Sequence, residues 1–310
     1  METGIYKDMS DSDYNAIDAI RWSSLKHILD SPLAYKFEAE KLREDKDCFR
    51  FGRAFHAALL RPDVFADKHI VAPPEHVTKT GWSKKPAAQA WLADMGEDDL
   101  PVTEHELGKL EHMSNRIAVN PDAPEWIRLC DVDQDGGIEV VAVWIETIEV
   151  DGVEVTIKCK AKADGVSFRA GMLMDAKTHQ ARGKRMSLRT IESTIGTFMY
   201  DAQLAYYARG FRAAAIESGL GADPFDLRTF IFAESVPPHD LACVQLDDDA
   251  VQEGDAVAEK ALRMYARALH TDRWPGCADG VEVVSLPRWR MPQNDDNDVA
   301  GDLGLTGLEG

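Results

Sequence analysis

The sequence predicts one α/β (α+β) domain, with a central mixed sheet flanked by helices and a helical region at its N-terminus. Helical and strand patterns follow one another as helices, three strands, one helix, two strands and one helix. No internal repeat and no strong linker requires a second domain. We therefore expect one domain over residues 1–294. Its part up to residue 130 is mainly helical, and residues 131–294 carry the sheet core and the C-terminal helices. The acidic, Gly-rich tail over 295–310 is expected to be disordered.

Helix signals dominate the first half of the chain. Ser10 to Asp13 is typical of a helix N-cap region, and Phe49 to Leu60 is an apolar helix that ends at Arg61-Pro62. Thr103 and Glu106 have capping-box spacing. The further expected elements are helices over 23–29, from Pro32, and over 86–95, 104–119 and 124–129, a short strand over 69–72, and a mobile basic loop over 73–85.

Strand patterns dominate the middle of the chain. Residues 138–148, 153–163 and 172–178 are expected to form a three-stranded meander, with Asp164-Gly165 and Ala170-Gly171 as turn residues. Residues 198–217 have the pattern of the longest helix. The remaining expected elements are a helix over 187–195, strands over 228–234 and 241–246, and a helix over 248–268.

Polar side chains follow the buried strands of this meander at unexpected places. Asp175 and Lys177 lie at i and i+2, so on a strand they project from the same face. Asp164 on the neighbouring strand places a second carboxylate near them. Two carboxylates and a lysine suit a Mg²⁺ centre that hydrolyses phosphate esters. A solvated Asp–Lys pair on an open sheet face is the alternative explanation.

Two helical pairs add further candidates. Gly52 and His56 lie at i, i+4, so the glycine leaves room for close approach to the imidazole, although a core histidine bonded to a backbone carbonyl is the alternative. Gln203 and Tyr207 have the same spacing on the helix over 198–217, where a tyrosine commonly serves packing.

Composition limits the class of protein. The 310 residues are 45% hydrophobic, contain no apolar run of about 20 residues, and start without the pattern of a signal peptide. Five scattered cysteines without a C-x-x-C pair argue against zinc, disulfide or iron–sulfur sites, and indicate a cytoplasmic protein. We expect no membrane association and no iron–sulfur cluster.

The net charge of −19 disfavours nucleic acid on average, but the cations are clustered. A basic groove within an acidic surface is therefore compatible with the sequence. A solvated charged face is the alternative for each cluster taken singly. The candidate DNA-binding cations are Lys162, Arg182, Lys184, Arg185 and Arg189.

Taken together, these landmarks resemble a known nuclease family. Gly52-x-x-x-His56, Asp164, Asp175-Ala176-Lys177 and Gln203-x-x-x-Tyr207 occur in the order and approximate spacing of the RecB-like branch of the PD-(D/E)XK nucleases. The flanking segments are more narrowly similar to the RecE-like (exodeoxyribonuclease VIII) phage and prophage exonucleases. These segments are GIYKDMSDSDY, FGRAFHAALLRPDVFADKHIVAP, TDRWPG and SLPRW.

The resemblance implies a restriction-endonuclease-like core and a Mg²⁺-dependent exonuclease, in which Mn²⁺ would substitute for Mg²⁺. Such an enzyme degrades one strand of duplex DNA from a 5′ end and leaves a 3′ single-stranded tail for recombination. It also implies a RecT-like annealing partner, a homo-oligomeric ring and the cytoplasm of a bacterial host. An endonucleolytic or structure-selective nuclease, or a non-catalytic DNA-binding relative, is the alternative.

The same resemblance implies roles for individual residues. Asp164, Asp175, the backbone carbonyl of Ala176 and His56 would hold the metal, and Lys177 would orient the attacking water. Glu139 falls near an acidic position of related sequences. Gln203 and Tyr207 would contact the DNA or support the lysine. Ala163 stands where the motif has proline, and Asp175 replaces the commoner glutamate without changing the ligand type.

Overall fold

The computed structural model describes residues 1–41, 45–79, 81–96, 98–180, 185–220, 225–278 and 280–286. The chain divides into two units, Met1–Cys277 and Ala278–Gly310. All helices and strands given below belong to the first unit, and the described residues of the second form neither. The predicted tail over 295–310 lies outside the described residues, and the domain limit at residue 294 stays a prediction.

A mixed six-stranded sheet forms the centre of the first unit, in the order β1-β6-β7-β8-β9-β10. Only β8 and β9 run parallel, and every other neighbouring pair in this sheet is antiparallel. The strands are β1 (Gly4–Tyr6), β6 (Gly137–Val150), β7 (Val153–Ser167), β8 (Met172–His179), β9 (Leu227–Glu234) and β10 (Leu241–Gln245). The predicted meander is therefore confirmed as β6-β7-β8.

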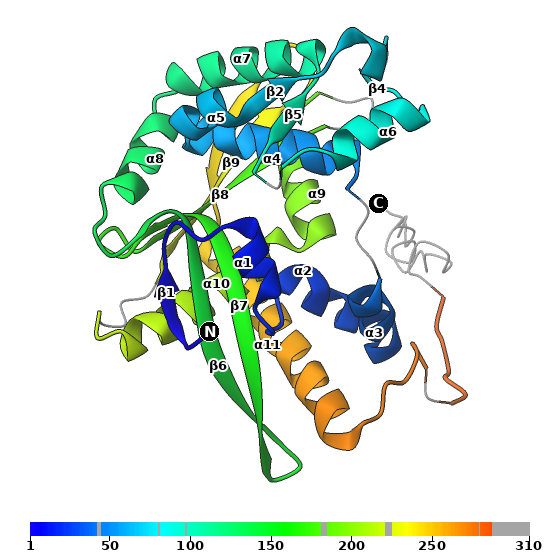
Figure 1. The fold of residues 1–310 in the computed structure, drawn as a ribbon. Coiled ribbons are helices and arrows are strands. Elements are labelled where there is room, and N and C mark those ends of the chain that lie inside the picture. Colours follow the sequence, from blue (N-terminus) through cyan, green and yellow to red (C-terminus); the bar gives the residue numbers. More distant parts are fainter. Residues whose placement is uncertain are drawn as a thin grey trace, which may run out of the picture. The chain divides into compact units, whose positions relative to one another are not determined.

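Helices cover both faces of this sheet (Figure 1). One face packs against α2 (Trp22–Leu25), α10 (Tyr200–Glu217) and α11 (Asp248–Thr271), with Trp144, Phe230 and Phe232 at its centre. The other face packs against α4 (Asp47–Leu60), α7 (Glu104–Ala118) and α8 (Ala123–Asp131). The strand pattern of β8 fits both layers, because Met172, Met174 and Ala176 face α4 while Leu173 faces α10.

Shorter elements complete the unit. Two small sheets, β2 (His69–Val71) with β5 (Leu100–Val102) and β3 (Val77–Thr78) with β4 (Gly81–Trp82), lie outside the main one. The remaining helices are α1 (Asp11–Ala16), η1 (Lys26–Leu29), α3 (Pro32–Glu40), α5 (Pro62–Lys68), η2 (Pro74–His76), α6 (Pro86–Ala93) and α9 (Leu188–Phe198). Among the described residues, no helix is both long and apolar enough to cross a lipid bilayer.

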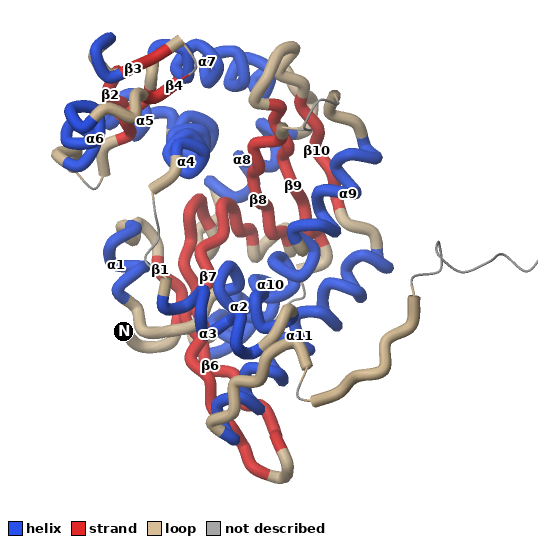
Figure 2. Tube along the Cα trace, turned by 90° about the vertical axis from the view of Figure 1, so that its right-hand side faces the viewer, coloured by secondary structure: helices blue, strands red, loops and turns tan. Residues whose placement is uncertain are grey.

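The strands β7 and β8 separate after a short paired stretch. Their backbone pairing covers only residues 165–167 of β7 and 172–174 of β8. Beyond Met174, β8 stays paired with β9, whereas β7 stays paired with β6. Figure 2 shows β8 and β9 running together while β7 follows β6. The sheet is thus forked between β7 and β8, and the residues at the fork have backbone groups without a strand partner.

Three local predictions are wrong. Asp164-Gly165 lies inside β7, and the chain reverses only after Ser167. Gly165 is needed for close packing instead of a turn, because a Cβ there would lie 2.7 Å from Met174 and 2.9 Å from the Cys130 sulfur. The helix over 198–217 is interrupted at Met199, which has a left-handed backbone with φ 54°, and the resulting α10 of 18 residues is shorter than α11 of 24 residues. The loop over 73–85 contains η2, β3 and β4.

The N-terminal segment is attached to the sheet by a buried lysine. Lys160 on β7 donates from Nζ to the carbonyl oxygens of Tyr14 and Ile17, each at 2.7 Å. The backbone of Ile20 bonds to that of Lys160, and the Tyr206 hydroxyl donates to the Ile20 carbonyl at 2.9 Å. Because a charged donor satisfies the carbonyl groups where α1 ends, the following segment with η1 is held against the sheet.

Gly210 on α10 sets how closely this helix approaches the sheet. A Cβ at Gly210 would collide with the ring of buried Trp144 on β6. We expect Gly210→Ala to lower the free energy of unfolding by about 1–3 kcal/mol, because overpacking forces the helix outwards. Urea denaturation measures this difference.

Gly108→Ala on α7 is the matched control, since a Cβ at Gly108 would meet no atom within 4 Å. This change should raise stability by about 0.5–1 kcal/mol through helix propensity alone. Equal stabilisation by both substitutions would contradict the close contact between α10 and β6.

Candidate active site

The fork between β7 and β8 is bridged by a carboxylate. Oδ2 of Asp164 accepts a hydrogen bond of 2.7 Å from the backbone N–H of Ala176. This N–H lies beyond the last backbone pair of the two strands, so the side chain takes the place of a missing strand partner. Asp164 is thereby held near Asp175 and Lys177, as expected from its place on the neighbouring strand of the predicted meander.

Asp175 and Lys177 project together from β8 towards α10. Lys177 Nζ lies 2.5 Å from Asp175 Oδ2, and Gln203 donates to Asp175 Oδ1 at 3.2 Å. Gln203 also donates to the Tyr207 hydroxyl at 3.1 Å. Asp175 is only 3% exposed. The structure therefore joins the predicted Asp–Lys pair and the predicted Gln–Tyr pair into one hydrogen-bonded group, in place of a solvated pair.

His56 reaches the same fork from the opposite face of the sheet. Its Nε2 lies 3.0 Å from the carbonyl oxygen of Ala176, and its Nδ1 lies 3.5 Å from Asp164 Oδ1. Both neighbours are acceptors, so in either neutral tautomer one ring nitrogen faces an oxygen without a hydrogen between them. A proton or a metal ion removes that conflict. A Cβ at Gly52 would meet no atom within 4 Å, so this glycine leaves open space.

Burial changes the titration of the two central groups. Removal from water raises the pKa of Asp175 to about 6, and nearby Asp164 adds to the rise while Lys177 opposes it. Burial alone would lower the pKa of Lys177, but the carboxylates of Asp175 and Asp164 outweigh it and raise this pKa. Lys177 is therefore a cation at neutral pH, and Asp175 becomes fully ionised only above about pH 6.

The donor atoms at the fork fit a hard cation. Asp164, Asp175 and the Ala176 carbonyl supply oxygen atoms, the ligand type that Mg²⁺ prefers. Asp175 Oδ2 is buried and, in the described part of the chain, makes an ion-pair contact but no directed hydrogen bond. No three His, Cys, Asp or Glu side chains among the described residues form a ready cluster, so such a site depends on the backbone carbonyl.

Two residues at the site were not predicted. Tyr200, the first residue of α10, places its ring 4.7 Å from Lys177 Nζ. Lys26 on η1 has a pKa lowered by burial and by the charge of Lys177. Among the described residues it has no anionic partner within ion-pair distance. The sequence placed both residues on helices, but neither belongs to a motif that brings it to β8.

Among the described residues, the other predicted side chains form no hydrogen bond or ion pair with Asp175 or Lys177. Glu139 has a left-handed backbone with φ 53° and lies 3.5 Å from Lys162 Nζ, which also pairs with Asp11 at 2.9 Å. Both acids neutralise Lys162. Arg185 and Arg189 are exposed. Arg182 and Lys184 lie outside the described residues.

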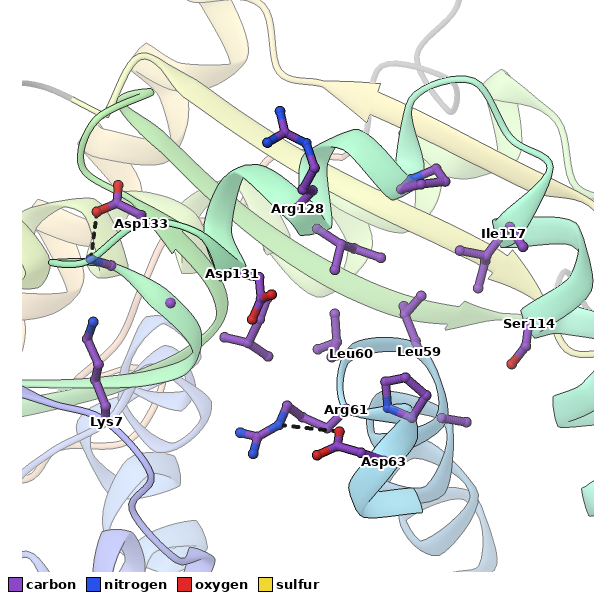
Figure 3. A pocket seen from close by; sticks show the side chains of 18 of the residues that line it. Lys7, Leu59, Leu60, Arg61, Asp63, Ser114, Ile117, Arg128, Asp131 and Asp133 are labelled. Carbon is purple, nitrogen blue, oxygen red and sulfur yellow. Dashed lines mark hydrogen bonds and ion pairs between the residues drawn. The ribbon is translucent and has the colours of Figure 1, made fainter. Parts of the chain in front are cut away.

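A large pocket of about 920 Å³ lies between the end of α4, α7, α8 and the start of β6 (Figure 3). It does not include the residues at the fork. Its Lys7 donates to the Gln134 carbonyl at 2.5 Å, and its Arg61 lies 3.6 Å from Asp8 and 3.9 Å from Asp63. Because these cations are already paired, the chemistry of the forked strands identifies the candidate active site better than the size of this pocket.

The charge balance at the fork leads to a direct test. Carboxyl ¹³C NMR titration should show Asp175 with a pKa of about 6. Lys177→Met should raise this pKa further because it removes the opposing cation. Asp164→Asn should lower it because it removes a neighbouring negative charge.

Glu139→Gln is the control for this titration, since Glu139 pairs with Lys162. It should leave the pKa of Asp175 unchanged. A shift caused by Glu139→Gln, or an ordinary pKa in the wild-type protein, would contradict the described charge arrangement.

Comparisons with known proteins concern the fold and the family of this chain. A crystal structure from Eubacterium rectale, of a protein with a provisional assignment as an exonuclease, matches with a TM-score of 0.52 and 15% identity. The match covers 91% of this chain and 96% of that one. At this identity it supports the fold alone. The structure of SSO0001 matches at 16% identity over 51% of this chain and 67% of that one, with a TM-score of 0.25 that supports no argument.

A comparison with curated proteins found no match. Residues 22–287, which include every residue at the fork, match the family model described as "PDDEXK-like domain of unknown function (DUF3799)". This family match supports nuclease activity. The chain therefore belongs to this family of PDDEXK-like domains and has the PD-(D/E)XK fold.

Proposed function

We propose that this protein is a Mg²⁺-dependent exodeoxyribonuclease that degrades one strand of linear duplex DNA, in the 5′→3′ direction, and leaves 3′ single-stranded tails. The observation that supports this most is the meeting of Asp164, Asp175 and Lys177 at the fork between β7 and β8. The family match supports nuclease activity in general. The direction of digestion and the exonucleolytic mode come from the resemblance to RecE-like proteins.

Lys177 acts as a hydrogen-bond donor and a positive charge. Its raised pKa keeps it protonated, so it cannot accept the proton of the attacking water. It can instead orient that water or stabilise the charge that develops on the phosphate. Gln203 holds Asp175 through Oδ1, which fixes the carboxylate on the side facing Lys177.

Asp164, Asp175 and the Ala176 carbonyl would hold Mg²⁺, with His56 beside them. When bound, Mg²⁺ supplies positive charge that activates water and neutralises the phosphate. The Ala176 N–H keeps one oxygen of Asp164 in place, so its other oxygen, which faces His56, is the one available for a cation. Tyr207 supports Gln203, which makes it a positioning residue.

The biological setting is proposed from the resemblance alone. A RecT-like annealing protein would use the 3′ tails, the enzyme would form a homo-oligomeric ring around DNA, and both would act in the cytoplasm of a bacterial host. Endonucleases and exonucleases can share the chemistry at the fork, so substrate form has to separate them.

Linear duplex DNA labelled at either end tests the proposed activity. With Mg²⁺, the wild-type protein should release 5′ label first, and EDTA should stop the release. Asp175→Asn should lower the rate by about a thousandfold or more, because loss of a charged ligand removes several kcal/mol of transition-state stabilisation. Cleavage of a covalently closed circular duplex, which has no end, would show an endonuclease and contradict the proposed exonuclease activity.

Glu125→Gln on α8 is the control, because Glu125 forms an exposed pair with Arg128 at 2.6 Å. It should keep the wild-type rate. A fully active Asp175→Asn protein would remove Asp175 from the mechanism.

The raised pKa of Asp175 predicts the pH dependence of cleavage. Below about pH 6 this carboxyl is protonated and cannot bind a cation, so kcat/KM should fall about tenfold per pH unit. Above about pH 6 the profile should level off. Higher Mg²⁺ should move the midpoint to lower pH, since the ion binds only the ionised form. If the midpoint of the pH profile did not change with Mg²⁺ concentration, Asp175 would not be a metal ligand.

A further inference from the structure

An aromatic stack leads from the catalytic lysine to the surface. The ring of Tyr200 lies 4.7 Å from Lys177 Nζ, and the ring of Phe198 stacks on Tyr200 with centroids 5.6 Å apart and planes at 23°. Phe198 is nevertheless 50% exposed. A large apolar ring is therefore presented to solvent directly beside the candidate active site.

This stack requires an unusual backbone between the two rings. Residues at i and i+2 of a continuous helix point in different directions and do not face each other. Met199 separates α9 from α10 with φ 54° and ψ 47°, a left-handed conformation that residues with a side chain rarely adopt. This break places Phe198 and Tyr200 on the same side. This left-handed residue ends α9, with the Met199 N–H donating to the carbonyl oxygens of Ile195 and Gly196, and it also brings the two rings together beside a catalytic group.

The charges beside the stack indicate what would lie on it. Lys177 Nζ lies 4.7 Å from the Tyr200 ring, and its charge helps to lower the pKa of Lys26, which has no anionic partner within ion-pair distance among the described residues. An occupant with an anionic group and a flat aromatic group would satisfy both features. A nucleotide has both, because its phosphate is anionic and every base has a π face.

We propose that Phe198 and Tyr200 form a stacking platform for a nucleobase of the strand being cleaved, next to the phosphate at Lys177 and Lys26. This proposal rests on the proposed function and adds a base-binding subsite to it. Stacking does not depend on which base is present, so the platform would hold any sequence in position. It would also favour an unpaired base, because a base within a duplex is already stacked on its neighbours.

Fluorescent DNA tests the platform without cleavage. A linear duplex carrying 2-aminopurine at its 5′-terminal nucleotides is mixed with the full-length protein in EDTA. The wild-type protein should quench the fluorescence by stacking. Phe198→Ala and Phe198→Leu should both lose the quench and bind about 5- to 100-fold more weakly, whereas Phe198→Tyr should keep both properties. Quenching by Phe198→Leu equal to wild type would overturn the proposal, because leucine has no ring.

The salt dependence of binding separates stacking from charge. Phe198→Ala should leave the slope of log K against log salt unchanged. Lys26→Gln should reduce the magnitude of this slope by about 1, because it removes one phosphate contact. Phe37→Ala, which removes another exposed phenylalanine on α3, is the matched control and should bind like wild type. Circular dichroism melts confirm that all variants are folded.

The outcomes also separate this proposal from the proposed function. Wild-type protein that binds no DNA would remove both. Wild-type protein that binds DNA, with quenching that survives Phe198→Ala, would remove the platform only. In that case contact with another protein would be the remaining explanation for the exposed Phe198 ring.

Discussion

The hydrogen bond from the Ala176 N–H to Asp164 is the constraint on which the site depends. Where β7 and β8 separate, a backbone donor loses its strand partner, and a buried donor without a partner costs about 1–3 kcal/mol. Asp164 supplies the missing acceptor and is itself fixed by doing so. One contact thus stabilises the open sheet and positions a carboxylate, while His56 and Lys177 approach the opening from opposite faces.

The candidate site of this acidic protein places lysine among carboxylates. In a protein with a net charge of −19, Lys177 pairs with Asp175, the Asp164 charge also raises the pKa of Lys177, and the charge of Lys177 lowers the pKa of Lys26. Burying an ion pair is costly unless each partner is well contacted. Gln203 on Asp175 and the Tyr200 ring near Lys177 supply these contacts.

The sequence predicts the site better where it depends on strand alternation than where it depends on packing. Asp175 and Lys177 share a face because successive residues of a strand alternate. The turn predicted at Gly165 is wrong because the sequence does not distinguish a glycine needed for close contact with Met174 from a glycine needed for a turn. The break at Met199 was missed because methionine favours helices. Lys26 reaches the site through tertiary contacts of the N-terminal segment, which no local pattern records.

The buried ammonium of Lys160 has a consequence for how the chain can be shortened. It caps the carbonyl oxygens where α1 ends, and so joins the first twenty residues to β7. Deleting those residues would remove these acceptors and uncover Val141 and Val143 on β6, which pack against Tyr14 and Ile17. We therefore expect the smallest stable fragment to begin before α1, even though the family match begins only at residue 22. A fusion partner is better tolerated when a spacer separates it from that segment.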